Sequence, residues 1–348
     1  MENKIDSFDV NGPGIKGNLF GLPFTRDSAK MIIVPVPWEV TVSYKKGTAL
    51  GPGAILEASS QIDLFHPEIA DCWKLGIAML PVKKEIYEEN KSLRELAEIH
   101  IRGIERQDSP QPDHVVINKI NESCEHLNAY VKNTCAQLLK EGKLVGILGG
   151  DHRTPFGFLR TLAEKYERFG VLQIDAHADL RHAYEGFQYS HGSIIYNALK
   201  LPAISKIVQL GIRDFCEEEM LTMHRAGKRI KTFFDADIKE AHFQGKSWAL
   251  QCDDIIKELP DLVYISFDID GLNPSLCPHT GTPVPGGFEL APIIFLLKKI
   301  VKSGKKIIGF DLCEVAPGEN EWDANVGARI LWELCNWMGV SHKLLSLN

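Results

Sequence analysis

Seven short hydrophobic runs recur along the chain, and segments with other patterns separate them. The runs are rich in valine and isoleucine and nearly continuous, as burial on both faces of a parallel sheet requires. Residues 290–303 and 322–338 instead show the spacing of amphipathic helices. This rhythm predicts an α/β fold. The predicted strands span 31–37, 143–150, 170–177, 206–212, 229–234, 262–270 and 306–315.

Residues 83–142 break this rhythm with a long charged region. We interpret it as two helices on either side of a polar turn, SPQPD, at residues 109–113. The helices could form an inserted hairpin that packs against the sheet, and nothing in their composition demands a separate domain. We therefore expect one domain over residues 1–348, with a helical insertion at about 83–142.

The composition narrows the class of function. With 44% hydrophobic and 24% charged residues, the 348-residue chain is typical of globular proteins. A net charge of −7 argues against general binding to nucleic acid or anionic membrane, so we expect a small-molecule partner. No hydrophobic run approaches the roughly 20 residues that cross a bilayer. Eight cysteines without a CxxC pair, and no signal-like N-terminus, indicate a cytoplasmic protein with reduced thiols.

The stretch VLQIDAHADLR carries metal-binding side chains at every second position. Successive side chains of an extended segment alternate between its faces. Asp175, His177 and Asp179 can therefore converge on one side if the strand continues through them or bends gently.

Two other predicted strands end in similar side chains. Asp268 and Asp270 share a face in SFDID, and His152 follows two glycines in GGDH. The functional crevice of an open α/β sheet lies outside the carboxyl ends of its strands. All six side chains could therefore meet there.

Four carboxylates and two imidazoles, with no thiolate, suit Mn²⁺ or a related divalent ion better than structural zinc. Taken alone, each acid is more often a turn or helix-capping residue. Burying several acids together without a cation would be severely unfavourable, however. If Asp175 and Asp268 bridge two metals about 3.5–4 Å apart, a water bound between the metals becomes a nucleophile near neutral pH. The set predicts a hydrolase.

Five motifs give the chain a wider resemblance. Their order and approximate spacing resemble those of the ureohydrolases, which include arginase, agmatinase and formimidoylglutamase, and the resemblance covers most of the chain. It implies a three-layer α/β/α fold of the arginase/deacetylase type with a mainly parallel sheet. The motifs are GGDH (149–152), DAHAD (175–179), SFDIDGLNPS (266–275), GTPVPGG (281–287) and EVAP (314–317).

The resemblance also implies a cofactor of two Mn²⁺ ions per chain and a homo-oligomer, often a trimer or hexamer. Co²⁺, Ni²⁺ and Fe²⁺ can accept the same donors. By motif, one manganese is held by His152, Asp175, Asp179 and Asp268, and the other by Asp175, His177, Asp268 and Asp270.

Further catalytic and substrate-binding roles follow from the same resemblance. Glu314 would receive the substrate guanidinium, and His191 in YSHGS would contact the substrate and shuttle protons. Asp179 belongs with them as a catalytic residue. The alternatives are that Glu314 only caps a loop and that His191 only bonds a backbone carbonyl. We expect His182 and His279 to be structural.

Arg181 stands where arginases carry an asparagine that binds the amino-acid end of arginine. The segment LRHAYEGFQYSHGS is closer to the agmatinases, so agmatine is favoured. If Arg181 faces the pocket as a substrate-binding residue, it would repel the distal ammonium of agmatine and could pair with the carboxylate of 4-guanidinobutanoate. The alternative is that Arg181 turns outward and pairs with surface acids such as Glu185.

Two smaller departures are expected at the rim of the site. Arg153 follows GGDH where serine is common. The acid usually found six residues beyond the EVAP glutamate is replaced by Asn320, and Asp323 could substitute for it. Both departures concern the identity of the substrate and leave the metal ligands intact.

The sequence therefore predicts a binuclear manganese hydrolase that cleaves the guanidino group of a small linear substrate to urea and an amine. The alternatives are a guanidino-acid hydrolase, an arginase and a formimidoylglutamase. A catalytically silent metal-binding protein of the same fold is the alternative outside enzymes. The one-zinc deacetylases of this fold use a different ligand set, and the paired ligand motifs argue against them.

Overall fold

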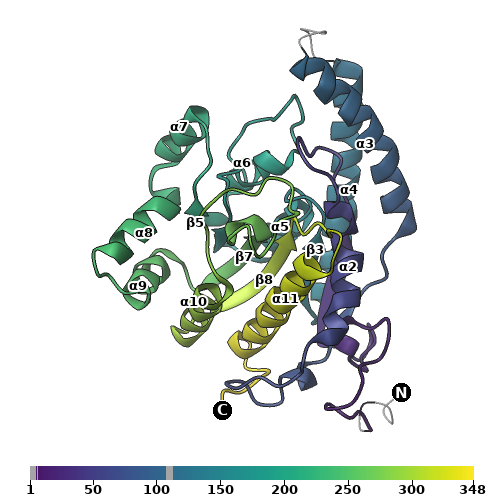
Figure 1. The fold of residues 1–348 in the computed structure, drawn as a ribbon, viewed down its shortest axis with the longest axis vertical. Coiled ribbons are helices and arrows are strands. Elements are labelled where there is room, and N and C mark those ends of the chain that lie inside the picture. Colours follow the sequence, from purple (N-terminus) through teal and green to yellow (C-terminus); the bar gives the residue numbers. More distant parts are fainter. Residues whose placement is uncertain (1–4, 6, 107–112) are drawn as a thin grey trace.

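The computed structural model describes residue 5, residues 7–106 and residues 113–348. An eight-stranded parallel sheet forms its centre, in the order β2-β1-β3-β8-β7-β4-β5-β6, and helices surround it (Figure 1). This arrangement confirms the predicted α/β fold class. The strands are β1 (Met31–Val36), β2 (Ile77–Met79), β3 (Leu144–Gly149), β4 (Phe169–Ile174), β5 (Ile204–Ile212), β6 (Ile230–Phe234), β7 (Leu262–Asp268) and β8 (Lys306–Cys313).

All seven predicted strands are present, and the sequence pattern missed β2. This strand has only three residues and pairs on one side, with β1. Strands β1, β3 and β4 are buried along their whole length, as their nearly continuous hydrophobic runs predict.

Alternate side chains of the strands enter two hydrophobic cores, one on each face of the sheet. In β1, Ile33 packs into the first core, and Ile32 and Val34 pack into the second. The first core is covered by α2 (Gly51–Ala58), α8 (Asp235–Phe243), α9 (Trp248–Glu258), α10 (Leu290–Lys302) and α11 (Trp322–Ser341). The second is covered by α3 (Lys84–Glu105), α4 (His114–Lys140), α5 (Phe156–Lys165), α6 (Ile194–Leu199) and α7 (Glu217–Ala226).

Helices α3 and α4 lie within the segment in which two helices were predicted, and they pack side by side (Figure 1). The carboxylate of Asp113 caps α4 by accepting hydrogen bonds from the backbone N–H groups of Val115 and Val116. Helix α4 then packs against α5 and the sheet strands β1 and β3. Of the predicted turn at 109–113, only Asp113 belongs to the described residues.

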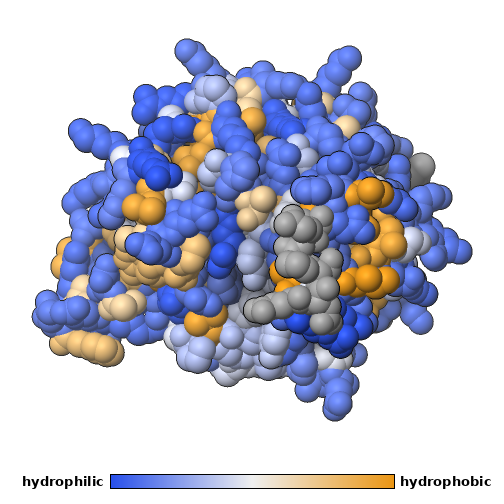
Figure 2. Space-filling model, turned by 90° about the horizontal axis from the view of Figure 1, so that it is seen from above, coloured by the Kyte–Doolittle hydropathy of each residue, from blue (hydrophilic) through white to orange (hydrophobic). Residues whose placement is uncertain are grey.

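Figure 2 views one end of the molecule, which is covered mainly by hydrophilic side chains, with hydrophobic ones in separate patches. All eight cysteines are unpaired, and seven of them are buried. Within the described ranges, no helix combines the length and hydrophobicity needed to cross a membrane.

Candidate metal centre

The predicted metal-binding side chains meet at the carboxyl ends of three strands from the middle of the sheet. Strand β8 lies between β3 and β7, and β4 follows β7, so these ends are neighbours. The structure brings all six residues to this place. His152 follows β3, whereas Asp175, His177 and Asp179 follow β4, Asp268 ends β7, and Asp270 lies in the 3₁₀ helix η7 (Ile269–Gly271).

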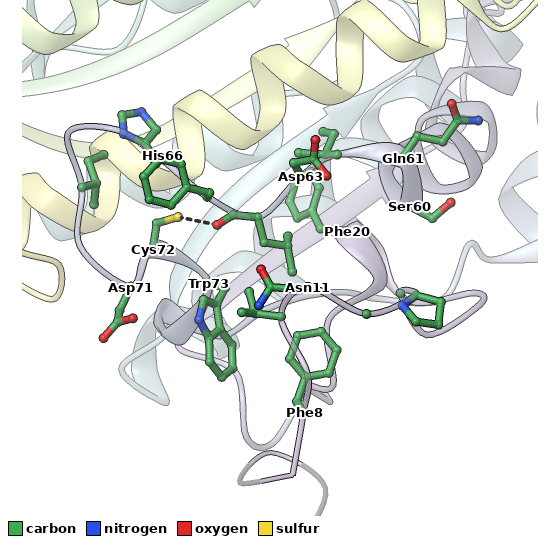
Figure 3. Close-up of a pocket in the computed structure, with 18 of the residues that line it drawn as sticks. Phe8, Asn11, Phe20, Ser60, Gln61, Asp63, His66, Asp71, Cys72 and Trp73 are labelled. Carbon is green, nitrogen blue, oxygen red and sulfur yellow. Dashed lines mark hydrogen bonds between the residues drawn. The ribbon is translucent and has the colours of Figure 1, made fainter.

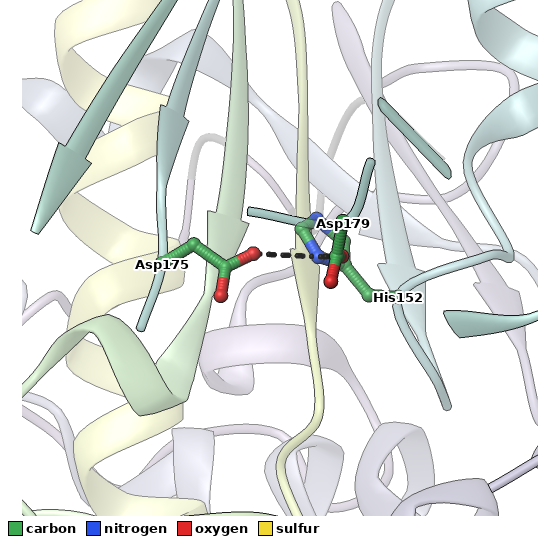
Figure 4. A group of neighbouring side chains, drawn as sticks. All are labelled: His152, Asp175 and Asp179. Carbon is green, nitrogen blue, oxygen red and sulfur yellow. Dashed lines mark ion pairs between the residues drawn. The ribbon is translucent and has the colours of Figure 1, made fainter. Parts of the chain in front are cut away.

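His152, Asp175 and Asp179 form one group, in which the three side chains point toward one another (Figure 4). Nδ1 of His152 lies 3.0 Å from Oδ2 of Asp175 and 3.0 Å from Oδ2 of Asp179. Oδ2 of Asp268 is 3.4 Å from the same nitrogen. None of these contacts has hydrogen-bond geometry, so the buried nitrogen is left without a partner among the described residues. The group surrounds a point where a cation would fit.

Asp175, His177 and Asp270 form a second group beside the first. Nδ1 of His177 lies 3.0 Å from Oδ2 of Asp270 and 3.7 Å from Oδ1 of Asp175. Asp175 belongs to both groups, as a carboxylate that bridges two metal ions would.

Turns, and not a continuous strand, bring these side chains together. The side chains converge although the strand does not continue through them as the alternation argument supposed, because β4 ends at Ile174 and Asp179 adopts a left-handed conformation with φ of 54°. Asp270 likewise lies beyond β7, where its N–H donates to Oδ1 of Asp268 at 2.9 Å. The carboxylate of Asp270 in turn accepts a hydrogen bond from the N–H of Ala176. The chain leaves the extended conformation at both places, so the spacing of two residues identified the right side chains without describing the backbone that places them.

The carboxylates of the two groups cannot all be ionised at once in the absence of cations, because they are buried close together. Burial and the charge of Asp175 raise the pKa of Asp179 to about 7. Burial, Asp270 and Asp175 raise the pKa of Asp268 well above its usual range. Burial lowers the pKa of His152, but the nearby carboxylates outweigh burial and raise that pKa overall. Protons therefore balance the acids in the protein alone, and divalent cations could replace them. The donor set fits two hard or borderline divalent ions.

A second layer of polar groups orients these side chains. Nε2 of His152 lies 2.9 Å from the hydroxyl of Ser266, which directs Nδ1 toward the carboxylates. Gln173 donates from Nε2 to Oδ2 of Asp175 at 2.8 Å. The sequence reasoning missed both residues. Ser266 stands two positions before Asp268 in SFDID, so the same alternation argument could have found it.

Glu314 lies directly after β8, beside the first group. Its Oε1 accepts a hydrogen bond from the N–H of His152 at 2.8 Å, and its own carbonyl accepts one from Oγ1 of Thr280 at 2.8 Å. Its φ of 63° is unusual for a residue with a side chain and costs about 1–3 kcal/mol. Burial and the charge of Asp151 raise the pKa of Glu314. The fold thus holds this carboxylate in a strained position next to a metal-binding side chain.

His191 begins the 3₁₀ helix η5 (His191–Ser193). Its Nδ1 lies 3.1 Å from the carbonyl oxygen of Thr41, and its ring meets that of Tyr184 edge-on at 5.8 Å. Burial and the nearby His177 lower the pKa of His191 to about 4, so the ring is neutral at neutral pH. A neutral ring that donates from Nδ1 to the carbonyl leaves the lone pair of Nε2 free. The sequence allowed for a bond from His191 to a backbone carbonyl but could not identify Thr41 as the partner, because a backbone carbonyl carries no sequence signal.

A cavity of about 440 Å³ opens beside the two groups. Its wall includes His177 and Asp179 from the groups, together with His191. Arg181, two residues after Asp179, continues the wall, and loops from other parts of the chain complete it, among them those of Tyr44 and Asp214. Of the predicted catalytic and substrate-binding residues, Asp179, His191 and Arg181 therefore line one small space. Glu314 is not part of this wall and lies behind it, against the backbone of His152.

Arg181 faces this cavity. Its guanidinium carbon lies 4.6 Å from the centre of the Tyr184 ring, and Arg181 and Tyr184 both line the cavity. In the part of the chain that the structure describes, its guanidinium makes neither a hydrogen bond nor an ion pair. The alternative of an outward ion pair with Glu185 is not the arrangement found.

The two departures expected at the rim lie elsewhere. Arg153 is only 1% exposed, and its Nη2 donates to the carbonyl of Cys124 and to Oδ1 of Asn128, both in α4. The expectation of a rim position was wrong, because the long side chain runs inward to the helix. Asp323 is buried and accepts a hydrogen bond from Nδ1 of His279 at 2.8 Å, so its carboxylate is engaged away from the cavity.

A larger cavity, of about 830 Å³, lies in another part of the molecule (Figure 3). Segments that precede β1 and β2 form it together with the C-terminal residue, Asn348. Aromatic rings such as Phe8, Phe20 and Trp73 line it beside scattered polar groups. Neither group of metal-binding side chains borders this cavity, so the chemistry favours the smaller one.

The carboxyl ends of the central strands are where parallel α/β sheets place their ligand sites, and here they carry buried carboxylates and imidazoles that could hold divalent ions. Residues 29–336 match the model of the Arginase family, and the chain belongs to this family. The chain is therefore a hydrolase that acts on carbon–nitrogen bonds, as its resemblance to the ureohydrolases predicted.

Relatives cover nearly the whole chain. The N(1)-aminopropylagmatine ureohydrolase of Thermus thermophilus is 30% identical over 322 residues, which are 92% of this chain and 94% of the relative. The agmatinase of Bacillus anthracis is 28% identical, over 84% of this chain and 85% of the relative. Among solved structures, the agmatine ureohydrolase of Thermoplasma volcanium superposes with a TM-score of 0.72 at 21% identity, covering 99% of each chain. This last likeness confirms the fold.

Proposed function

We propose that the protein is a binuclear manganese enzyme that hydrolyses the guanidino group of a small linear substrate to urea and an amine. The observation that carries this proposal is the convergence of two groups of metal-binding side chains, joined by Asp175, beside one cavity. By motif, the first ion would be held by His152, Asp175, Asp179 and Asp268, and the second by Asp175, His177, Asp268 and Asp270.

When bound, the metal pair supplies Lewis acidity and lowers the pKa of water. The side chains around the pair bind and orient the substrate. The carboxylate of Glu314 lies against the first group and suits the planar N–H donors of a guanidinium. A guanidino group bound by Glu314 would lie next to the side chains that would hold the first ion.

His191 is suited to move a proton to the leaving amine. Its ring is neutral, and the Thr41 carbonyl fixes the proton on Nδ1, so Nε2 can accept a proton and release it within the cavity. The catalytic role of Asp179 follows from its place in the first group, next to His152.

Agmatine or an N-substituted relative of it is the favoured substrate. The relatives of this chain include an N(1)-aminopropylagmatine ureohydrolase and an agmatinase. Asp214 lines the cavity with its side chain 68% exposed. Its Oδ2 lies 3.9 Å from Nε2 of His177, and the exposed carboxylate would also attract a distal ammonium. The guanidinium of Arg181 stacks on the ring of Tyr184, so the positive charge that would repel this ammonium is held against an aromatic ring.

A guanidino acid such as 4-guanidinobutanoate is the second candidate. The observation that favours it is the position of Arg181 in the cavity wall with its N–H donors unused by described residues. A carboxylate at the far end of the substrate would accept from them.

The test is a substrate panel for the Mn²⁺-loaded protein. Urea release is measured with agmatine, N(1)-aminopropylagmatine, 4-guanidinobutanoate, 3-guanidinopropanoate, arginine and guanidine, and formamide release with formimidoylglutamate. Preference for an amine-bearing substrate supports the first candidate, and preference for a carboxylate supports the second. Formamide release would identify a formimidoylglutamase. A fully metal-loaded protein that is silent on every substrate would contradict the proposal and favour the non-catalytic alternative.

We also propose that residues 1–348 form one cytoplasmic domain that assembles as a homo-oligomer. A trimer or a hexamer is the expected state. Light scattering coupled to gel filtration measures it directly, and a monomer at micromolar concentration would refute this part of the proposal.

A further inference from the structure

Helix α3 holds the two loops that meet at His191. Asn90 of α3 accepts a hydrogen bond from the N–H of Glu39 at 2.6 Å, in the loop that follows β1. His100 of α3 bonds the carbonyl of Glu185 at 3.0 Å, in the loop that leads to His191. Both side chains are buried polar groups on a helix that is otherwise amphipathic. The helix therefore contributes specific hydrogen bonds to the site as well as hydrophobic packing.

Arg94, which lies between these two residues on α3, makes the most extensive of these contacts. Its Nη1 donates to the carbonyl of Val40 at 3.1 Å and to the carbonyl of Val42. Its Nε donates to Oε1 of Glu98, one turn further along the helix, at 3.2 Å. Arg94 is 9% exposed, so these bonds form largely out of water. A planar guanidinium with donors on several edges can hold all three acceptors together.

The residue between the two held carbonyls is Thr41. The carbonyl oxygen of Thr41 is not bound by Arg94 and lies 3.1 Å from Nδ1 of His191. Its hydroxyl reaches the carbonyl of Tyr189, two residues before His191, at 3.5 Å. Arg94 thus fixes the segment 40–42 from one side, and this segment orients the imidazole from the other.

We propose that Arg94 is a positioning residue that sets the orientation and tautomer of His191 through the backbone of residues 40–42. This inference rests on the proposed function, in which His191 moves a proton. Loss of the guanidinium releases the carbonyls of Val40 and Val42. The Thr41 carbonyl between them is then no longer held against Nδ1 of His191, and the proton distributes between the two ring nitrogens. A misplacement of about 1 Å at a catalytic group can cost about 10² in rate.

The experiment compares Arg94→Met, Arg94→Lys and Arg102→Met in the Mn²⁺-loaded protein. Arg102 is a matched control, because it lies on the same helix with its side chain 64% exposed, and its one ion pair within the described ranges is with Glu98. For Arg94→Met we expect kcat to fall roughly 10- to 100-fold with KM and metal content nearly unchanged. Arg94→Lys keeps the positive charge but replaces the planar guanidinium with a single ammonium group, so its kcat should be intermediate. Arg102→Met should resemble the wild type.

A second readout does not depend on turnover. ¹⁵N-histidine spectra of the protein loaded with diamagnetic Zn²⁺ report which ring nitrogen of His191 carries the proton, and His191→Gln assigns the signal. We expect the Nδ1-protonated tautomer in the wild type and a mixture in Arg94→Met. If Arg94→Met does not fold, Arg94→Lys serves for both readouts and should show a partial change in each.

The outcomes separate the two proposals. An unchanged His191 tautomer, or wild-type kcat in a folded and fully loaded Arg94 variant, would overturn the role of Arg94. A wild-type protein that is inactive on every guanidino substrate would overturn the proposed function alone. In that case the spectra still decide whether Arg94 orients His191.

Discussion

Removal of the Ser266 hydroxyl should weaken metal binding without touching a metal ligand. Nε2 of His152 lies 2.9 Å from this hydroxyl, and Ser266 is 1% exposed, so no water can easily replace it. Ser266→Ala would leave a buried N–H without an acceptor, which costs about 1–3 kcal/mol. Outer groups that orient a ligating histidine are typically worth about 10- to 100-fold in metal affinity. These factors correspond to about 1.4–2.7 kcal/mol, so the two estimates agree in size.

The assay is titration of the metal-free protein with Mn²⁺ by calorimetry or by competition with a chelating dye. Ser59→Ala is the matched control. Ser59 is fully buried, accepts a hydrogen bond from the N–H of Phe20 and donates to the carbonyl of Leu56, far along the chain from the metal-binding residues. We expect the control to lose stability and keep its metal affinity. Wild-type affinity in folded Ser266→Ala, or an equal loss in Ser59→Ala, would refute the reasoning.

Three further predictions concern the site. Asp268→Ala should lose metal content and urea release together, measured by elemental analysis and a urea assay, and a variant that keeps both would contradict the shared carboxylate. Arg181→Ala should lose turnover of guanidino acids and keep or improve that of agmatine if Arg181 binds a carboxylate, whereas equal rates for both would remove it from substrate binding. An acid whose pKa is raised by folding favours the folded state at low pH, and this stability is lost as the pH rises. The Tm of EDTA-treated protein should therefore fall between about pH 4, near the pKa of an unfolded aspartate, and the pKa of Asp179, about 7. Binding of Mn²⁺ should remove most of this fall. A metal-free Tm that rises over this range would contradict the balance of acids by protons.

The strands could be predicted because burial on both faces leaves a strong mark on the sequence. The run at β3 has no polar side chain and the run at β4 has one, Gln173, as strands buried on both faces of a parallel sheet require. Strand β2 left no such mark, since three residues at the edge of a sheet need little hydrophobic length. Element type was therefore predictable where burial was complete.

The site was predictable in its side chains and not in its backbone. The spacing of Asp175, His177 and Asp179 pointed to one place, but the chain reaches it through the left-handed turn at Asp179. Arg153 shows the same limit, because nothing near it in the sequence reveals Asn128, its partner in α4. Contacts between residues far apart in the chain depend on packing that a single sequence does not encode locally.

The strand order has a consequence for the route by which the site comes into being. Strand β8, the last to be synthesised, sits between β3 and β7, so two halves of the sheet stay apart until Lys306–Cys313 inserts between them. Pairings between segments so distant in sequence form slowly. His152 and Asp268 therefore face each other only in a finished chain, and a nascent chain on the ribosome offers no complete place for a metal ion. Loading with metal should follow release and folding of the whole protein.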